Sequence, residues 1–239
     1  MFSFLNNIPQ VTKNILLINV MMFIVATILF NVTNGQTNLF NTLSIYFFQS
    51  PNFRPFQFVT CMFMHSQYDI MHIILNMYAL VIFGSFLEKI WGEKRFLIFY
   101  IVCGLGASVF DQIVSYIEIQ NIMSHYTTNL SNGITQMNPT EMYQYSRITL
   151  VPSLGASGAL MGVLAGFAFL FPNTEMMMMF IPFPIKAKFL IGGYMFYEIY
   201  KSVNVDINDN VGHLAHIGGA LTGLIFIIIR RKFDKKNFW

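Results

Sequence analysis

Charged residues are scarce in this chain of 239 residues, since Asp, Glu, Lys and Arg together make up 10% of it. Soluble domains carry roughly 25% charged residues, because their surface must face water. At the same time 55% of the residues are hydrophobic, including 26 Phe and 16 Met. The shortage of polar surface excludes an ordinary water-soluble domain and indicates that much of the chain faces lipid.

Other absences limit the kinds of site that the chain can contain. The two cysteines, Cys61 and Cys103, lie in or beside apolar runs, which favours buried free thiols, and their spacing fits no zinc site. The HExxH motif of zinc proteases is also missing, because His213-Leu214-Ala215-His216 lacks the Glu. The net charge of +3 is small and gathers near the C-terminus, so we expect no nucleic-acid partner.

Long apolar runs are what the chain has instead. A helix needs about 20 mostly apolar residues to cross a bilayer. We predict six such spans, near residues 14–30, 68–88, 96–117, 153–171, 188–204 and 211–230. No small-x-small cleavage site follows the first span, so we expect a retained anchor rather than a signal peptide. The predicted fold is an all-α membrane protein, a six-helix bundle forming a single domain over residues 1–239.

Lys and Arg predict the orientation of this bundle. Eleven of them lie near the helix ends on the side of the termini, against three on the opposite side. The positive-inside bias therefore places both termini in the cytoplasm, and the composition fits a bacterial inner membrane. On the cytoplasmic side we expect residues 180–186 to be a connector.

Two long connectors are expected on the outer side. Residues 31–67 are rich in Asn, Phe and Pro and suit the membrane interface. Residues 118–151 are polar, and Asn138-Pro139-Thr140-Glu141 within them is typical of a helix start.

Polar side chains inside a bilayer are costly, so each is a candidate for function. The second span carries His72 and Asn76 on one helical face, the fourth carries Ser157, and the sixth carries His213 and His216. All three spans run inward from the outer side. Ser157, His216 and His72 each fall about five residues from that end, roughly 7 Å deep at about 1.5 Å per residue. They can therefore meet at one level.

These residue types suit acyl transfer. A serine hydroxyl is a weak nucleophile until a base takes its proton, and neutral imidazole can do this near pH 7. We predict that Ser157 is the nucleophile and His216 its base. The intermediate needs fixed donors for its oxyanion, which His72, Asn76 and the Ser157 N–H could supply. His213 is the weaker candidate base, because it lies nearer the helix end and off the helix face that carries Gly212, Gly219 and Gly223.

Glycines support a close pairing of the fourth and sixth spans. They recur at steps of three and four, which lets two helix backbones approach each other. By themselves they indicate tight packing only. The fourth span contains Gly155, Gly158, Gly162 and Gly166, and the sixth contains Gly212, Gly219 and Gly223 beside Gly218.

Three motifs resemble those of the rhomboid family of intramembrane serine proteases. Gly155-Ala156-Ser157-Gly158 resembles the GxSG element of that family. His72 and Asn76 resemble its HxxxN, and Ala215-His216 followed by Gly219 resembles its AHxxG. The motifs also follow one another in the family's order, and the resemblance covers roughly residues 50–230.

This resemblance implies a six-helix rhomboid core with a Ser157–His216 dyad and no third carboxylate. His72 and Asn76 would be the oxyanion donors. It implies transmembrane protein substrates, cut near the outer end of their helix and entering between the second and fifth spans. No metal or cofactor is implied.

The sequence departs from the family at two places. Phe56-Gln57 stands where members often carry Trp-Arg in the first outer loop. Met161 stands where some members carry a Tyr that packs against the catalytic histidine, so other residues must orient His216. The 118–151 connector is also longer than in minimal members.

Two alternatives stay open. One is a rhomboid-like binding protein without activity, against which the retained Ser157, His216 and Asn76 argue. The other is a transporter that uses His72 and His216 as a proton relay, against which the lack of midplane carboxylates argues.

Of the remaining polar residues, His65 and His125 are interpreted as loop or interfacial residues. Asp69 and Glu88 are expected to reach water, and Glu198, in the outer half of the fifth span, has no assigned role.

Overall fold

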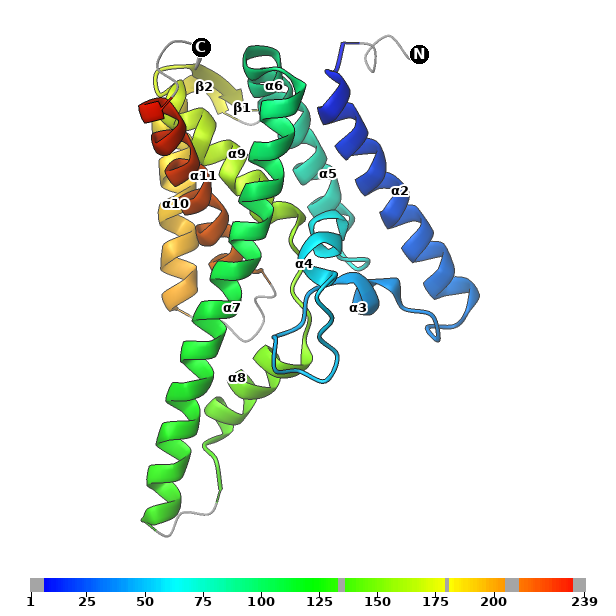
Figure 1. Ribbon diagram of the computed structural model, residues 1–239, viewed down its shortest axis with the longest axis vertical. Helices are drawn as coiled ribbons and strands as arrows, with labels where there is room; N and C mark the ends of the chain where they lie inside the picture. The colour runs from blue at the N-terminus through cyan, green and yellow to red at the C-terminus, as the bar shows by residue number, and fades with distance from the viewer. Residues whose placement is uncertain (1–6, 133–135, 179–180, 205–210, 234–239) are drawn as a thin grey trace.

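The computed structural model describes residues 7–132, 136–178, 181–204 and 211–233, and these are mostly helical. Figure 1 shows the long helices side by side. Four helical segments of the described residues are long and apolar enough to cross a membrane: α2 (Gln10–Val32), the continuous helix Ile70–Trp91, α7 (Glu93–Ser131) and α11 (His213–Phe233). The shorter helices α9 (Ala156–Leu170) and α10 (Ala187–Val203) complete the bundle. The predicted all-α membrane bundle is confirmed, although two helices are shorter than a full span.

The helix Ile70–Trp91 has three parts: α5 (Ile70–Ala79), the π-helical segment η2 (Leu80–Gly84) and α6 (Ser85–Trp91). Glu88 of α6 is buried, although we expected it to reach water. Its carboxylate accepts hydrogen bonds from Val11 N at 2.8 Å, and from Thr12 N and Oγ1 at 2.7 Å each. The first N–H groups of a helix lack intrahelical partners, so this carboxylate caps α2. The prediction was wrong because the span end meets a helix terminus instead of water.

The helix α7 differs most from expectation. Residues 118–131, predicted to lie in a polar connector, continue it to a length of 39 residues. At about 1.5 Å per residue it is about 58 Å long, well beyond the roughly 30 Å of a hydrocarbon core. The sequence becomes polar after residue 117 but has no Gly or Pro up to Ser131, so the helix continues beyond the apolar run.

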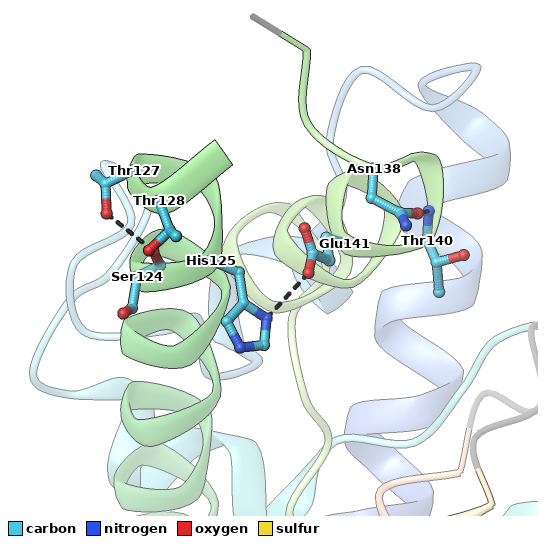
Figure 2. Close-up of polar contacts among 7 residues, drawn as sticks. All are labelled: Ser124, His125, Thr127, Thr128, Asn138, Thr140 and Glu141. Carbon is cyan, nitrogen blue, oxygen red and sulfur yellow. Dashed lines mark hydrogen bonds and ion pairs between the residues drawn. The ribbon is translucent and has the colours of Figure 1, made fainter. Parts of the chain in front are cut away.

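The helix α8 (Pro139–Leu150) folds back against α7 and starts where the sequence predicted. The Asn138 side chain caps it by accepting a hydrogen bond from Thr140 N at 2.9 Å. His125 of α7 and Glu141 of α8 meet with 3.2 Å between Nδ1 and Oε1 (Figure 2). His125 is thus an exposed residue of a helix, not of a loop. The two helices form a hairpin that projects from the bundle (Figure 1).

The segment between α2 and α5 contains α3 (Leu39–Leu43), α4 (Gln57–Thr60) and the 3₁₀ turn η1 (Cys61–Phe63). Gln57, at the Phe56-Gln57 departure, is buried and organises this segment. Its amide nitrogen donates to the Thr42 and Asn52 carbonyls at 3.1 and 3.2 Å. Its oxygen accepts from Arg54 N at 3.0 Å. A single buried amide thus anchors the loop.

The free thiols behave as predicted, because Cys61 and Cys103 are both unpaired and buried. Burial raises the pKa of the Cys61 thiol to about 11. The Cys61 carbonyl accepts a hydrogen bond from Gly155 N at 2.9 Å, so η1 supports the segment that leads into α9.

The connection from α9 to α10 is an antiparallel hairpin of β1 (Glu175–Met178) and β2 (Ile181–Lys186), which pairs Glu175 with Lys186. The connector predicted over residues 180–186 thus falls on β2, apart from residue 180, which lies outside the described residues. The hairpin lies at the end of the bundle where α2 begins and α11 ends (Figure 1).

Candidate active site

The helix α9 lies inside the bundle, packed against α5, α7, α10 and α11 (Figure 1). It begins at Ala156, three residues later than the predicted span. Ser153 forms a backbone bridge with Ile45, with N···O distances of 2.7 and 3.0 Å, which keeps residues 153–155 out of the helix. With 15 residues, α9 is about 22 Å long, shorter than the roughly 30 Å of a hydrocarbon core.

Glycines bring α9 and α11 into direct backbone contact. A Cβ added at Gly219 would overlap the carbonyl oxygen of Gly158, and one at Gly223 would lie 2.7 Å from the carbonyl oxygen of Gly162. The predicted close pairing of these two helices is therefore confirmed. Gly212 differs, since its added Cβ would find its nearest neighbour at 3.6 Å, an ordinary contact. Close packing does not require a glycine there.

This backbone contact brings the predicted nucleophile and base together. Ser157 Oγ lies 2.7 Å from His216 Nε2, and the two side chains are 7% and 5% exposed. Ser157 is the second residue of α9, His216 the fourth of α11 and His72 the third of α5. The three residues thus lie in the first turn of three helices that run in the same direction. The sequence had predicted a position about five residues from the outer end of each span.

The start of α9 also supplies free donors. The first backbone N–H groups of a helix have no intrahelical acceptor, and they form the positive end of the helix dipole. Among the residues that the structure describes, no side chain caps α9, whose N-cap residue is Gly155. The Ser157 N–H lies in this first turn and is therefore a candidate donor to a developing negative oxygen.

The predicted side-chain oxyanion donors lie on α5, which packs against α9. Asn76 is buried, and its Nδ2 has no hydrogen-bond partner among the described residues. A buried amide donor without a partner is costly and available to a ligand oxygen. His72 is half-buried and lies close enough to His216 for the two rings to interact electrostatically. The exposed Asp69 caps α5, accepting from Met71 N at 3.0 Å.

The burial of His65 was not predicted from the sequence. This residue does lie in a loop, but its side chain is fully buried and edge-on to His72, with 5.4 Å between ring centroids. Burial, and to a lesser extent the neighbouring His72, lowers the pKa of His65 to about 3, so the ring is neutral. Its contact with His72 spans an irregular segment, which sequence periodicity does not register.

Glu198 of α10 is the second residue whose role the sequence did not reveal. It is 1% exposed, and its Oε2 lies 2.6 Å from His213 Nδ1 and 3.0 Å from His216 Nδ1. The contact with His216 is at ion-pair distance, although its geometry does not meet that of a hydrogen bond. A carboxylate in an apolar span was the available signal.

The same contacts distinguish the two histidines of α11. His213 turns its Nδ1 toward Glu198, whereas His216 contacts Ser157 through Nε2. The departure at Met161 predicted that other residues must orient His216, and Glu198 is in position to do so.

Comparison with known proteins agrees with these motifs. Residues 52–233 match the Rhomboid domain. Similar proteins include Presenilin-associated rhomboid-like protein A, mitochondrial, of Danio rerio, which is 27% identical in an alignment of 186 residues that covers 73% of this chain and 39% of that protein. Rhomboid protease AarA of Providencia stuartii is 24% identical over 181 residues, covering 70% of this chain and 54% of its own length.

RHOMBOID-like protein 12, mitochondrial, of Arabidopsis thaliana is 31% identical over 163 residues, which are 67% of this chain and 42% of that protein. The chain thus spans 39% to 54% of the length of these three relatives. The family match itself covers well over half of the present sequence. With its apolar helices and this match, the chain is an integral membrane protein that belongs to the rhomboid family.

Proposed function

We propose that this rhomboid family member is an intramembrane serine endopeptidase that cleaves membrane-anchored proteins near the outer end of their transmembrane helix. The observation that carries this proposal is the 2.7 Å contact between Ser157 Oγ and His216 Nε2 inside a helical bundle. A buried serine next to an imidazole acceptor is the arrangement that general-base activation of a hydroxyl requires.

The reaction starts with His216 neutral and Nε2 unprotonated. As Ser157 Oγ bonds to the scissile carbonyl carbon, its proton passes to Nε2 and the carbonyl electron pair moves to the oxygen. His216 then gives this proton to the leaving amine as the C–N bond breaks, which leaves an acyl-enzyme on Ser157. Water, activated by the same imidazole, releases the second product. Neither step requires a metal or a cofactor.

Three donors are available for the negative oxygen of the intermediate. The Ser157 N–H lies in the first turn of α9, where helical N–H groups lack partners. The Asn76 amide nitrogen is buried without a partner among the described residues, and His72 lies on the same face of α5. We assign the oxyanion site to these three groups. Each of them gains strength where water is excluded.

The short α9 supports cleavage below the membrane surface. If its C-terminal end lies at one surface of a roughly 30 Å hydrocarbon core, Ser157 lies about 8 Å beneath the other. A substrate helix would need to unwind only at its end to reach this depth. We propose that it enters between α5 and α10, as the family resemblance implies.

We further propose that both termini lie in the cytoplasm and that the protein resides in an inner, or cell, membrane. The excess of Lys and Arg at the helix ends near the termini supports this orientation. A reporter that is active only outside the cytoplasm, fused after Trp239, should stay inactive. An active reporter would reverse the orientation.

A His relay for transport is the weaker reading of the site. The carboxylate that contacts the histidines is Glu198, which lies in the last turns of α10 at the level of Ser157. A relay through the midplane would need such a group deeper in the bundle. His216 contacts Glu198 through Nδ1, but its other ring nitrogen contacts a serine and not a second acid. This arrangement favours the protease. The retained site residues also favour it over a rhomboid-like binding protein without activity.

The experiment is cleavage of a fluorogenic membrane-anchored substrate by purified protein in liposomes. Ser157→Ala and His216→Ala should each lower kcat/KM by at least about 10³-fold, because such residues act as a unit. EDTA should leave the rate unchanged. Substrate cleavage that survives either substitution would remove the dyad, and no cleavage by the parent protein of any tested substrate would favour the binding protein.

A further inference from the structure

The carboxylate of Glu198 is placed to act on the catalytic imidazole from behind. The side chain is 1% exposed and comes from α10, which packs on α11. Its Oε2 lies 3.0 Å from His216 Nδ1, the ring nitrogen opposite the one that contacts Ser157. Ser157, His216 and Glu198 therefore form a continuous chain of contacts across α9, α11 and α10.

A buried carboxylate is held ionised only where donors or positive charge surround it. Here His213 Nδ1 lies 2.6 Å from the same Oε2, and Tyr194, one turn earlier on α10, is close enough for its hydroxyl to act on the carboxylate. These two groups fix Glu198 while its oxygen remains directed toward His216. The carboxylate is therefore part of a connected polar group rather than an isolated charge.

The position of the carboxylate selects the tautomer of His216. An acceptor beside Nδ1 favours the proton on that nitrogen, which leaves the Nε2 lone pair for the Ser157 hydroxyl. Once Nε2 takes the serine proton, the ring becomes a cation about 3 Å from a carboxylate in a site of low dielectric. The resulting attraction exists only after proton transfer begins, so it stabilises the transition state more than the ground state.

Glu198, His213 and His216 also have the donor types of a zinc site. Two ligands about 2.0–2.1 Å from a tetrahedral zinc ion lie about 3.3 Å apart. Both nitrogen-to-oxygen distances at Glu198, 2.6 and 3.0 Å, are shorter than this. The distances are those of direct contacts between the side chains, so the geometry favours a carboxylate–histidine network over metal ligation.

We propose that Glu198 is a positioning residue that holds His216 in the reactive tautomer and opposes the charge of its imidazolium, which extends the dyad to a Ser157–His216–Glu198 chain. This inference rests on the proposed protease function. Glu198 stays ionised throughout the reaction: the serine proton travels from Oγ to Nε2 and on to the leaving amine, and it does not reach the carboxylate.

The expected effect is smaller than in serine proteases with a dedicated carboxylate, where loss of the charge lowers kcat about 10⁴-fold. The Glu198 oxygen is shared with His213, and the His216 N–H is not aligned with it. We therefore expect Glu198→Gln, which keeps the shape and removes the charge, to lower kcat about 10- to 10³-fold with KM changed less than about 3-fold.

The test measures kcat, KM and the thermal midpoint in detergent for Glu198→Gln and Glu198→Asp. Glu141→Gln is the matched control, because Glu141 also contacts a histidine, at 3.2 Å, but in the projecting hairpin (Figure 2). Glu198→Asp, which retains the charge, should recover part of the lost kcat. Glu141→Gln should leave kcat unchanged. Equal losses for the Gln and Asp variants, in step with a lowered thermal midpoint, would reduce Glu198 to a structural residue.

A double substitution separates action through His216 from any other effect. In the His216→Ala background, Glu198→Gln should lower the residual rate of fluorophosphonate labelling less than about 3-fold, because its partner is already gone. An undiminished further loss would overturn the proposal, as would a Glu198→Gln enzyme with unchanged kcat. Failure of the protease function itself is recognised separately, by cleavage that persists in Ser157→Ala.

Discussion

The contact between Gly158 and Gly219 is the most demanding packing feature of the site, and Gly219→Ala tests its importance. The added Cβ would overlap the Gly158 carbonyl oxygen, whereas carbon and carbonyl oxygen normally stay about 3.3–3.6 Å apart. The overlapped oxygen belongs to the backbone, which no rotamer change can move. The two helices must therefore separate by more than about 1 Å.

Such a separation acts directly on the proposed catalytic pair. Ser157 precedes Gly158 on α9, and His216 lies one turn before Gly219 on α11. The 2.7 Å contact between Oγ and Nε2 would lengthen to about 3.5 Å or more, beyond a hydrogen bond. A displacement of about 1 Å at a reacting group can lower the rate about 10²-fold, and overpacking of this kind costs about 1–3 kcal/mol of stability.

The assay compares cleavage rates and thermal midpoints in detergent for Gly219→Ala and Gly193→Ala. Gly193 of α10 is the matched control, because a Cβ there would meet nothing within 4 Å. We expect a loss of about 10²-fold for Gly219→Ala and almost none for the control. If Gly219→Ala cleaves at the parental rate, close backbone approach is not what brings Ser157 and His216 together.

Three further predictions concern residues outside the proposed catalytic pair. Glu88→Ala should lower the free energy of unfolding by about 2–4 kcal/mol, because it leaves the capped N–H groups of α2 unpaired. Denaturation measures this loss, and Glu93→Ala, at an exposed position, should change the free energy of unfolding little. Asp69→Ala should cost about 1 kcal/mol of stability and lower kcat/KM several-fold by loosening the first turn of α5, with Asp69→Asn retaining both. Cys61 should resist maleimide at pH 7.5 in the folded protein, because its pKa of about 11 leaves fewer than about one thiol in a thousand ionised. Rapid modification of Cys61 would contradict its burial.

The sequence was most informative where the membrane restricts the choices. Ser157 and His216 are recognisable because polar residues in an apolar span are few, and depth along a helix follows from residue number. The error in that depth came from residues 153–155, which bridge to Ile45 and delay the start of α9. Hydropathy does not register a backbone contact with a distant loop.

The roles of Glu198 and Glu88 depended on information that one sequence lacks. Hydropathy indicates that a carboxylate lies within or near a span, but not the rotation of its helix or the identity of its neighbour. Glu198 faces two histidines of α11, and Glu88 faces the first turn of α2. The extension of α7 illustrates a related limit, because a change to polar composition marks the end of the apolar run and not the end of a helix.

The most direct test of the account is the site of covalent modification by a fluorophosphonate in the folded protein. Peptide mass spectrometry should find a single adduct on Ser157, with labelling abolished in Ser157→Ala and strongly slowed in His216→Ala. The 2.7 Å contact with His216 Nε2 is the reason for this reactivity. An adduct on another serine, or a Ser157 that stays unmodified while the bundle is intact, would contradict the assignment of Ser157 as an activated nucleophile.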